Sequence, residues 1–318
     1  MPVQKKSYAT VTVDADGGLP VPAGVVEDFG IKEGDLGGLK KLPGGKWELT
    51  FWRQLRPKGC RPTKSPQAPD YVAITQKLHP PMTKIVAVGD IHHGPNLEQI
   101  EAAIEREQPD LTVFVGDYFD QFHDHYDHAR RTAIWLKQSL AKPNRVHLWG
   151  NHDLPYGFSE YAYCPGYDPA KERAIRSVLD EQDWAKLKLW HLESRWLFTH
   201  AGLSLPYALT DTVNLRDYLR TEEKRAWAAL TSREPHWFWS VGMARGGFTP
   251  VGGLLWCDWE REFKPVPGLN QVLGHTPART FRVMHGPSSE NWCIDVTSMT
   301  GITHILAIDD SGPRPVEV

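Results

Sequence analysis

Cysteine is scarce in this chain, and long apolar runs are missing. Only four of the 318 residues are cysteines, at positions 60, 164, 257 and 293. Because no two of them form C-x-x-C, the spacing argues against a zinc knuckle and favours reduced thiols in a cytoplasmic protein. No run approaches the roughly 18 apolar residues that cross a bilayer. The first 18 residues also lack the apolar stretch of a secretion signal, so we expect no membrane association.

A strong charge of either sign is absent as well. The formal net charge of −3 gives no general attraction to nucleic acid or membrane. Residues 1–66 nevertheless hold eleven Lys or Arg against seven Asp or Glu, a surplus of four positive charges. Either a basic N-terminal module precedes an acidic, metal-binding one, or the difference is ordinary surface variation. The 41% hydrophobic and 24% charged residues are typical of globular domains.

The N-terminal part has the texture of a small β module. Residues 8–52 alternate apolar and polar positions, from ATVTV to WELTFW, and Gly-rich turns such as LPGGK separate the stretches. Residues 56–69 then contain four prolines, as a linker does. We therefore predict a β module over 1–55 and a linker over 56–82.

From residue 83 onward, apolar strands alternate with helical patterns. Helices are predicted over 95–107 and 128–141, between strands with sequences such as KIVAVGD and LTVFVGD. This alternation predicts an α/β domain over 83–318, built on sheets flanked by helices.

Five predicted strands end in polar residues of one kind. The strands are KIVAV, LTVFV, RVHLW, RWLFT and LNQVL, and the residues that follow them are Asp90, His92, Asp117, Asp120, Asn151, His152, His200 and His275. In α/β sheets, ligands bind outside the carboxyl ends of the strands, so these side chains should converge. Asp, Asn and His suit Mn, Fe or Zn. One carboxylate bridging two such ions would hold them roughly 3.5–4 Å apart.

These motifs resemble those of the calcineurin-like metallophosphoesterases. The similarity lies in GD-x-H, GD-x-x-D, GNH-D, the histidine of THAGLS and GHTP, over residues 83–309. THAGLS and LLWCDW are similar to the phosphoprotein phosphatase branch and its bacterial and phage relatives. The resemblance implies a metallophosphoesterase β-sandwich. It also implies hydrolysis of a phosphate ester by a metal-bridging hydroxide, without a covalent intermediate.

The resemblance also implies roles for matching residues. Six would bind two divalent ions, with Mn as the expected metal and Fe, Zn, Ni or Co as alternatives. They are Asp90, His92, Asp117, Asn151, His200 and His275. Asp117 would bridge both ions. His152, oriented by Asp120, would protonate the leaving oxygen.

Several positions depart from the family pattern. Gln121 stands where an arginine usually grips the phosphate. Either Arg261 replaces it, beside Asn151 as a second substrate contact, or Arg261 is an ordinary surface arginine. His93 is expected to face solvent, and residues 121–130 to form a solvated loop and helix start. The aromatic HWFW at 236–239 is expected to pack in the core or cover the site rather than stack on a base.

Residues 8–52 resemble the AbrB/SpoVT-type swapped-hairpin domain, through DADGGLPVP, VVEDFGIKEGD and the Gly-Gly hairpin before WELTFW. The family implies a homodimer that usually binds DNA, but Gly18 replaces its DNA-reading arginine, so dimerisation is the role we expect. The alternative function is a DNA-binding regulator or a phosphodiesterase directed at nucleic acid. Phosphoprotein, dinucleoside polyphosphate and nucleotide substrates all stay open.

Overall fold

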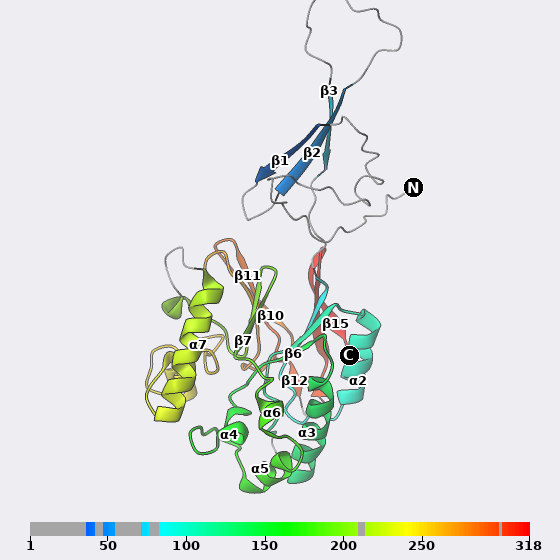
Figure 1. Ribbon diagram of the computed structural model, residues 1–318. Coiled ribbons are helices and arrows are strands. Elements are labelled where there is room, and N and C mark those ends of the chain that lie inside the picture. The colour runs from blue at the N-terminus through cyan, green and yellow to red at the C-terminus, as the bar shows by residue number, and fades with distance from the viewer. Residues whose placement is uncertain are drawn as a thin grey trace, which may run out of the picture. The chain divides into compact units, whose positions relative to one another are not determined.

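The computed structural model describes residues 83–121, 123–208, 214–298 and 301–318, together with the strands 36–41, 47–54 and 71–76 (Figure 1). The chain forms two compact units, 1–82 and 83–318. Among the described residues, no helix combines the length and the apolar character needed to cross a membrane.

The described part of the first unit is a three-stranded antiparallel sheet. Its strands are β1 (Leu36–Lys41), β2 (Trp47–Gln54) and β3 (Tyr71–Gln76), in the order β1-β2-β3. β3 falls inside the segment interpreted as a linker, which does not account for it. Its sequence, YVAITQ, is rich in residues that favour strands. The rest of the predicted swapped-hairpin module lies outside the described residues.

The first sheet of the second unit has the order β15-β14-β4-β5-β6. Its strands are β4 (Ile85–Val88), β5 (Leu111–Phe114), β6 (Arg145–His147), β14 (His304–Asp309) and β15 (Gly312–Glu317). β4, β5 and β6 run parallel. Helices α2 (Leu97–Glu107) and α3 (Tyr126–Leu140) connect them and match the two predicted helices closely.

The second sheet has the order β10-β11-β9-β8-β7. Its strands are β7 (Trp190–Glu193), β8 (Trp196–Thr199), β9 (Asn270–Leu273), β10 (Arg282–Gly286) and β11 (Ser289–Cys293). β8, β9 and β11 run parallel, and the two edge strands are antiparallel to their neighbours. Each five-stranded sheet therefore has three adjacent parallel strands, at the centre of the second sheet and reaching the β6 edge in the first.

The helix α7 and several shorter elements complete the unit. They are α4 (Leu154–Gly157), α5 (Pro169–Arg176), α6 (Glu181–Trp184), α7 (Leu215–Ser232), the 3₁₀ turns η2 (Leu205–Tyr207), η3 (Trp237–Trp239) and η4 (Met243–Arg245), and the pair β12 (Thr297–Ser298) and β13 (Gly301–Ile302).

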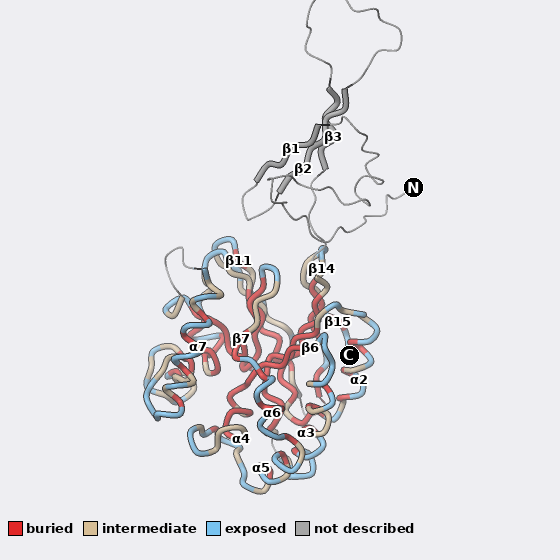
Figure 2. Tube along the Cα trace, viewed as in Figure 1, coloured by how far each residue is buried: buried red, intermediate tan, exposed pale blue. Residues whose placement is uncertain are grey.

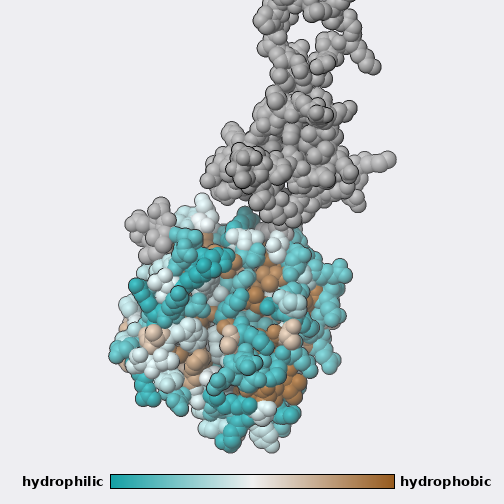
Figure 3. Space-filling model, viewed as in Figure 1, coloured by the Kyte–Doolittle hydropathy of each residue, from teal (hydrophilic) through white to brown (hydrophobic). Residues whose placement is uncertain are grey.

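Buried apolar side chains from both sheets and their helices form the core, which the red segments of Figure 2 trace along the strands. The face of the second unit that Figure 3 shows is mostly hydrophilic over the described residues. The predicted α/β fold of two sheets flanked by helices is confirmed. HWFW packs as expected: Phe238 is fully buried, and Trp237 stacks on Tyr207 at 4.8 Å.

Candidate metal centre and active site

The five predicted strand ends do converge. β4, β5 and β6 run parallel in one sheet, and β8 and β9 run parallel in the other, so within each sheet their carboxyl ends lie at the same edge. Four of the residues that follow them have the left-handed backbone that non-glycine residues rarely adopt, namely His92 (φ 43°), Asp117 (φ 53°), Asp120 (φ 64°) and His275 (φ 68°). Such strain is commonly found where backbone geometry serves a site.

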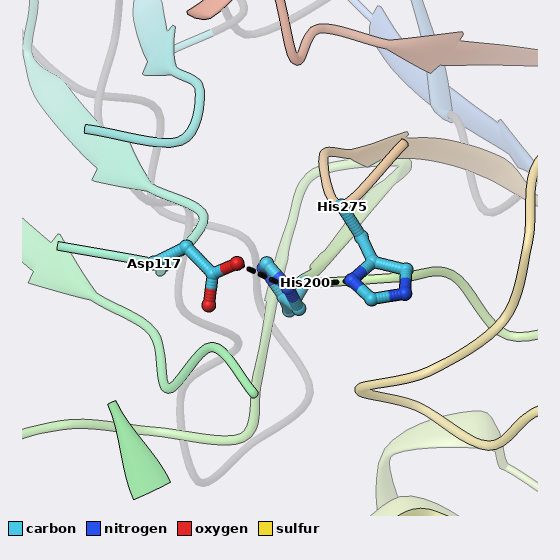
Figure 4. Close-up of side chains that lie close together, drawn as sticks. All are labelled: Asp117, His200 and His275. Atoms are coloured by element: carbon cyan, nitrogen blue, oxygen red, sulfur yellow. Dashed lines mark hydrogen bonds and ion pairs between the residues drawn. The ribbon is translucent and has the colours of Figure 1, made fainter. Parts of the chain in front are cut away.

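One group of side chains, Asp117, Asn151, His200 and His275, comes from four strand ends. His200 Nε2 lies 2.8 Å from Asn151 Oδ1 and 3.2 Å from His275 Nδ1, and Asn151 Oδ1 lies 2.7 Å from His275 Nδ1. Asp117 Oδ2 is 3.4 Å from His200 Nε2. Figure 4 shows His200 between Asp117 and His275, with both contacts drawn as dashed lines. All four side chains are buried.

Hydrogen bonds on the far side fix which atoms of this group face inward. His200 Nδ1 lies 2.9 Å from the Val115 carbonyl oxygen and donates to it in the neutral ring, which leaves the Nε2 lone pair facing Asn151 Oδ1. Asn151 Nδ2 contacts Cys164 Sγ, so its oxygen faces the histidines. The lone pairs of His200 Nε2 and Asn151 Oδ1 thus face each other, and this repulsion is removed only by a proton or a metal cation between them.

A second group consists of Asp90, His92 and Asp117, whose ligand atoms all lie within 4.8 Å of one another. His92 Nδ1 lies 2.5 Å from the Asp120 carbonyl oxygen, which directs the opposite nitrogen, Nε2, toward Asp117. The distance from His92 Nε2 to Asp117 Oδ2 is 3.5 Å. Asp117 Oδ2 therefore stands between the histidines of both groups.

Negative charge accumulates in this buried region. Burial raises the pKa of the Asp90 carboxyl, and the charges of Asp295 and Asp117 raise it further. Burial also raises the pKa of Asp295. For Asp117, burial is outweighed by the histidines around it, above all His200, and the pKa is lowered. Buried carboxylates so close together favour a bound cation.

The donor set fits divalent metal ions. Among the described residues, the buried atom Asp90 Oδ1 has no hydrogen-bond partner. A methyl group at Gly274 would come within 1.9 Å of Asp90 Oδ1, and one at Gly150 within 2.1 Å of Asp117 Oδ1. The loops thus approach both carboxylates as closely as glycine permits. Carboxylate, amide and imidazole donors are those that Mn, Fe and Zn accept.

Two further aspartates, to which the sequence analysis gave no role, organise this region. Asp153 accepts hydrogen bonds from the backbone N–H of Asp117, Tyr118 and Gly150, at 2.8–2.9 Å, and so ties two strand-end loops together. Asp295 follows β11, the third central parallel strand of its sheet. Asp153 is the last residue of GNH-D, but the Asp295 sequence, CIDV, has no glycine turn that could have marked it.

The predicted acid pair is also brought together. His152 Nδ1 lies 3.1 Å from Asp120 Oδ2. Burial lowers the pKa of His152, but the negative charge of Asp117 and the hydrogen bond to Asp120 outweigh it, so the pKa is raised well above its ordinary value. The His152 side chain is 24% exposed, so the ring still reaches solvent.

The expectation that His93 faces solvent is wrong. His93 is 2% exposed, and its ring contacts Thr132 on α3 at 3.0 Å and Asp124 at 3.2 Å. The left-handed backbone at this residue (φ 57°) accompanies an inward-facing ring. The 121–130 segment does contain a helix start, because α3 begins at Tyr126, but Asp124 takes part in a largely buried cluster.

That cluster, His93, Asp120 and Asp124, has the composition of a further metal site. A cation of the chain already lies within it. The Lys171 ammonium is 2.5 Å from Asp120 Oδ1 and 2.9 Å from Asp124 Oδ2. Since this charge neutralises one carboxylate, the cluster does not require a metal ion.

Arg261, the expected phosphate contact, is exposed at the surface. A different arginine, Arg245 at the end of η4, lies beside the metal ligands. Its Nη2 donates to the His275 carbonyl oxygen (3.2 Å) and to Thr276 Oγ1 (2.9 Å), and its Nε is 3.1 Å from Asp258 Oδ2. The side chain is 26% exposed and so borders solvent. It was missed because no motif surrounds it in the sequence.

A family model described as calcineurin-like phosphoesterase matches residues 83–289, which include every candidate ligand. The chain belongs to this family. Calcineurin-like phosphoesterases are metal-dependent hydrolases, so the two groups around Asp117 are candidate metal-binding residues in a family that uses metal.

Solved structures similar to this phosphoesterase share little sequence with it. A cold-active protein-tyrosine phosphatase from a psychrophilic Shewanella species is 11% identical, with 89% of this chain and 99% of that chain covered and a TM-score of 0.44. A protein serine/threonine phosphatase from Saccharomyces cerevisiae is 13% identical, with 75% and 81% covered and a TM-score of 0.40. A metallophosphoesterase from Sphaerobacter thermophilus is 13% identical, with 74% and 88% covered and a TM-score of 0.36. No curated protein sequence matches the chain.

Proposed function

We propose that this calcineurin-like phosphoesterase is a phosphatase that uses two divalent ions, with Mn²⁺ as the expected metal, to hydrolyse phosphate monoesters of proteins or nucleotides. The observation that carries the proposal is the position of Asp117 Oδ2, 3.5 Å from His92 Nε2 and 3.4 Å from His200 Nε2. An oxygen placed between two ligand groups is what a bridging carboxylate requires.

Each group would hold one ion. Asp90 and His92 would bind the first, Asn151, His200 and His275 the second, and Asp117 both. When bound, a pair of such ions neutralises phosphate charge and lowers the pKa of a coordinated water. The backbone bonds of His92 and His200, to Asp120 and Val115 carbonyl oxygens, would keep their ligating nitrogens directed inward.

His152 would supply the proton that the leaving oxygen needs. Its Nδ1 faces Asp120, so its other ring nitrogen, Nε2, is the one available to a substrate. The raised pKa keeps the ring protonated before the reaction, as a general acid must be.

Arg245 is our candidate for the phosphate contact that Arg261 was expected to make. A guanidinium beside His275 would place a fixed positive charge next to the second ion's ligands. Such a charge supports binding of a dianionic monoester. It would compensate for the weaker phosphate binding expected because Gln121 stands in place of an arginine.

For the N-terminal part, we propose dimerisation through residues 8–52. The support is the resemblance of its sequence to swapped-hairpin modules, together with the antiparallel pairing of β1 and β2 on either side of LPGGK.

The test is an assay of the full-length protein, stripped with a chelator and reloaded with Mn²⁺. Substrates would be p-nitrophenyl phosphate, bis-p-nitrophenyl phosphate, a phosphopeptide and diadenosine tetraphosphate. We expect hydrolysis of the monoesters, its loss on chelation, and about two ions per chain by elemental analysis. Full activity after exhaustive chelation would refute the metal-dependent proposal, and a preference for the diester would refute the monoester assignment.

A further inference from the structure

The carboxylate of Asp120 is held from two sides. Its Oδ2 faces the His152 ring, whereas its Oδ1 lies 2.5 Å from the Tyr156 hydroxyl and 2.5 Å from the Lys171 ammonium. Among the described residues, neither of these two donors to Oδ1 contacts His152. Rotation of the carboxylate would break both of these bonds.

The hydrogen bond from Lys171 to Asp120 Oδ1 comes from a buried lysine that is distant in the sequence. It lies on α5, which starts 49 positions after Asp120, and it is 5% exposed. An ammonium group buried to that degree needs compensating charge, because removing it from water costs several kcal/mol. Asp120 provides one carboxylate, and Asp124, 2.9 Å away through Oδ2, provides the second.

Asp124 is in turn fixed by its own contacts. It accepts from the Gln121 backbone N–H at 3.1 Å and pairs with Lys171, while His93 Nε2 lies 3.2 Å from its Oδ2. This ring nitrogen does not donate to Asp124 while it accepts from the Asp120 backbone. The Asp120 backbone N–H lies 3.0 Å from the same His93 nitrogen. The segment 120–124 and Lys171 on α5 thus belong to one network, which includes both the backbone N–H and the carboxylate of Asp120.

The charges of the network balance around the acid. Two carboxylates, Asp120 and Asp124, face one ammonium, Lys171, which leaves one negative charge for a protonated His152. Without Lys171, two carboxylates would lie behind the imidazolium, and Asp120 Oδ1 would keep only the tyrosine hydroxyl.

We infer that Lys171 is a positioning residue for the acid step: from α5, it holds the Asp120 carboxylate so that His152 points its proton at the leaving oxygen. Lys171 makes no contact with the candidate metal ligands among the described residues, so it acts through Asp120. The inference rests on the proposed function, because it presupposes that His152 is the acid.

The role predicts a dependence on the leaving group. p-Nitrophenolate departs with little help from an acid, whereas an alkoxide needs the proton. Lys171→Met, measured as the Mn²⁺ holoenzyme, should lose about 10- to 100-fold in kcat on an alkyl phosphate, a fraction of the ~10²–10⁴-fold that general acid catalysis supplies. On p-nitrophenyl phosphate the loss should be a few-fold at most. Lys171→Arg should restore most of the alkyl phosphate activity.

A matched control is Lys137→Met. Lys137 on α3 is also ion-paired, to Asp183 at 2.6 Å, but touches no residue of the acid pair. Its loss should leave both activities unchanged. In a His152→Asn background, Lys171→Met should cause no further loss of alkyl phosphate activity. A residue that acts only through His152 has no effect on the rate when His152 is absent.

Circular dichroism and metal content would establish that each variant is folded and loaded. If Lys171→Met does not fold, Asp124→Asn replaces it, because it releases the second anchor of the ammonium and should give a smaller loss with the same leaving-group selectivity. Equal losses on both esters, or full additivity with His152→Asn, would overturn the positioning role alone. If the wild-type holoenzyme hydrolyses neither ester, the proposed function fails and this inference fails with it.

Discussion

Asp90 has a buried carboxyl group whose surroundings disfavour its ionised form. Its Oδ1 has no hydrogen-bond partner among the described residues, and burial, Asp295 and Asp117 raise its pKa. A carboxyl with a raised folded pKa binds protons more tightly in the folded protein, so its ionisation lowers stability as pH rises above its ordinary value of 3.8. A bound cation would reverse this effect.

Asp90→Asn should therefore have opposite effects with and without metal. In a chelator at pH 7 the variant should melt at a higher temperature than the wild type, and this gain should shrink as pH falls toward about 4. With saturating Mn²⁺ the wild type should be the more stable of the two, because only it keeps the ligand charge. Thermal unfolding under both conditions checks this, and a destabilised variant in chelator would contradict it.

Asp117 should matter to both ions. The lowered pKa means that its carboxylate stays ionised throughout the neutral range. Asp117→Asn removes the shared charge, so bound metal should fall well below two ions per chain, and kcat should drop by at least about 100-fold. Elemental analysis and p-nitrophenyl phosphate turnover measure both. Glu234→Gln, at an exposed position, is the control and should change neither.

Arg245 and Arg261 offer a direct comparison between the structure and the sequence prediction. If Arg245 contacts the substrate phosphate, Arg245→Met should raise KM or lower kcat/KM by about 10- to 100-fold, in line with the loss of a charged hydrogen bond of about 1.5–3 kcal/mol. Arg261→Met should stay within twofold of the wild type, because Arg261 is exposed at the surface. The opposite ranking would restore the sequence-based assignment.

These residues also mark what the sequence could predict at this scale. Asp117, Asn151 and His275 follow strands in short Gly-containing motifs, so their types and order were readable. Arg245 and Lys171 have no such motif. They reach the site only through tertiary packing, by η4 and α5, which local patterns do not encode.

At the scale of elements, Glu101 joins three of them. On α2, it accepts hydrogen bonds from Trp135 on α3, from Lys142 just beyond that helix and from Arg145 on β6. Burial acts to raise its pKa, but the hydrogen bonds from Arg145, Lys142 and Trp135 and the charge of Arg145 lower it to about 2. The ionised carboxylate therefore stabilises the fold above its ordinary value of 4.5, and this contribution is lost as pH falls from 4.5 toward 2.

Glu101→Gln should lower the free energy of unfolding by about 2 kcal/mol at pH 7, since Arg145 and Lys142 keep their charges but lose the carboxylate that balances them. The difference from the wild type should narrow as pH falls below about 4.5. Urea unfolding at several pH values measures it, with Glu105→Gln on the exposed side of α2 as the control. A constant difference across pH would show that the charge of Glu101 is not the cause.

The elements themselves were predicted unevenly. β4, β5, β8 and β9 and helices α2 and α3 carry clear periodicity, and the structure has them where it was expected. β10 and β11 did not stand out, because RVMHG and SENWC are largely polar. Their strand character comes from pairing with each other and, for β11, with β9. β3 was missed for a different reason: its sequence favours a strand, but it follows a proline-rich stretch that suggested a linker.

At the scale of the whole molecule, the chain separates into units with different proposed tasks. All candidate ligands, the acid pair, Lys171 and Arg245 lie between residues 90 and 275, within the unit 83–318. That unit has its own core, to which both five-stranded sheets contribute. For the first unit we propose an assembly role, on the resemblance of residues 8–52 to swapped-hairpin modules.

Cutting the chain before Thr83, at the boundary between the units, should therefore separate assembly from catalysis. The full-length protein is expected to be a dimer by light scattering, and residues 83–318 a monomer with kcat on p-nitrophenyl phosphate within about threefold of the full-length value. The cut belongs at this boundary rather than earlier, because β3 pairs with β2 and so belongs to the first unit. A truncated protein that stays dimeric would refute dimerisation through residues 8–52. One that folds and binds Mn²⁺ but does not turn over would show that the first unit shapes the active site. If activity falls only on a phosphopeptide and not on the small ester, the first unit contributes to substrate recognition, and its lysines become the next residues to substitute.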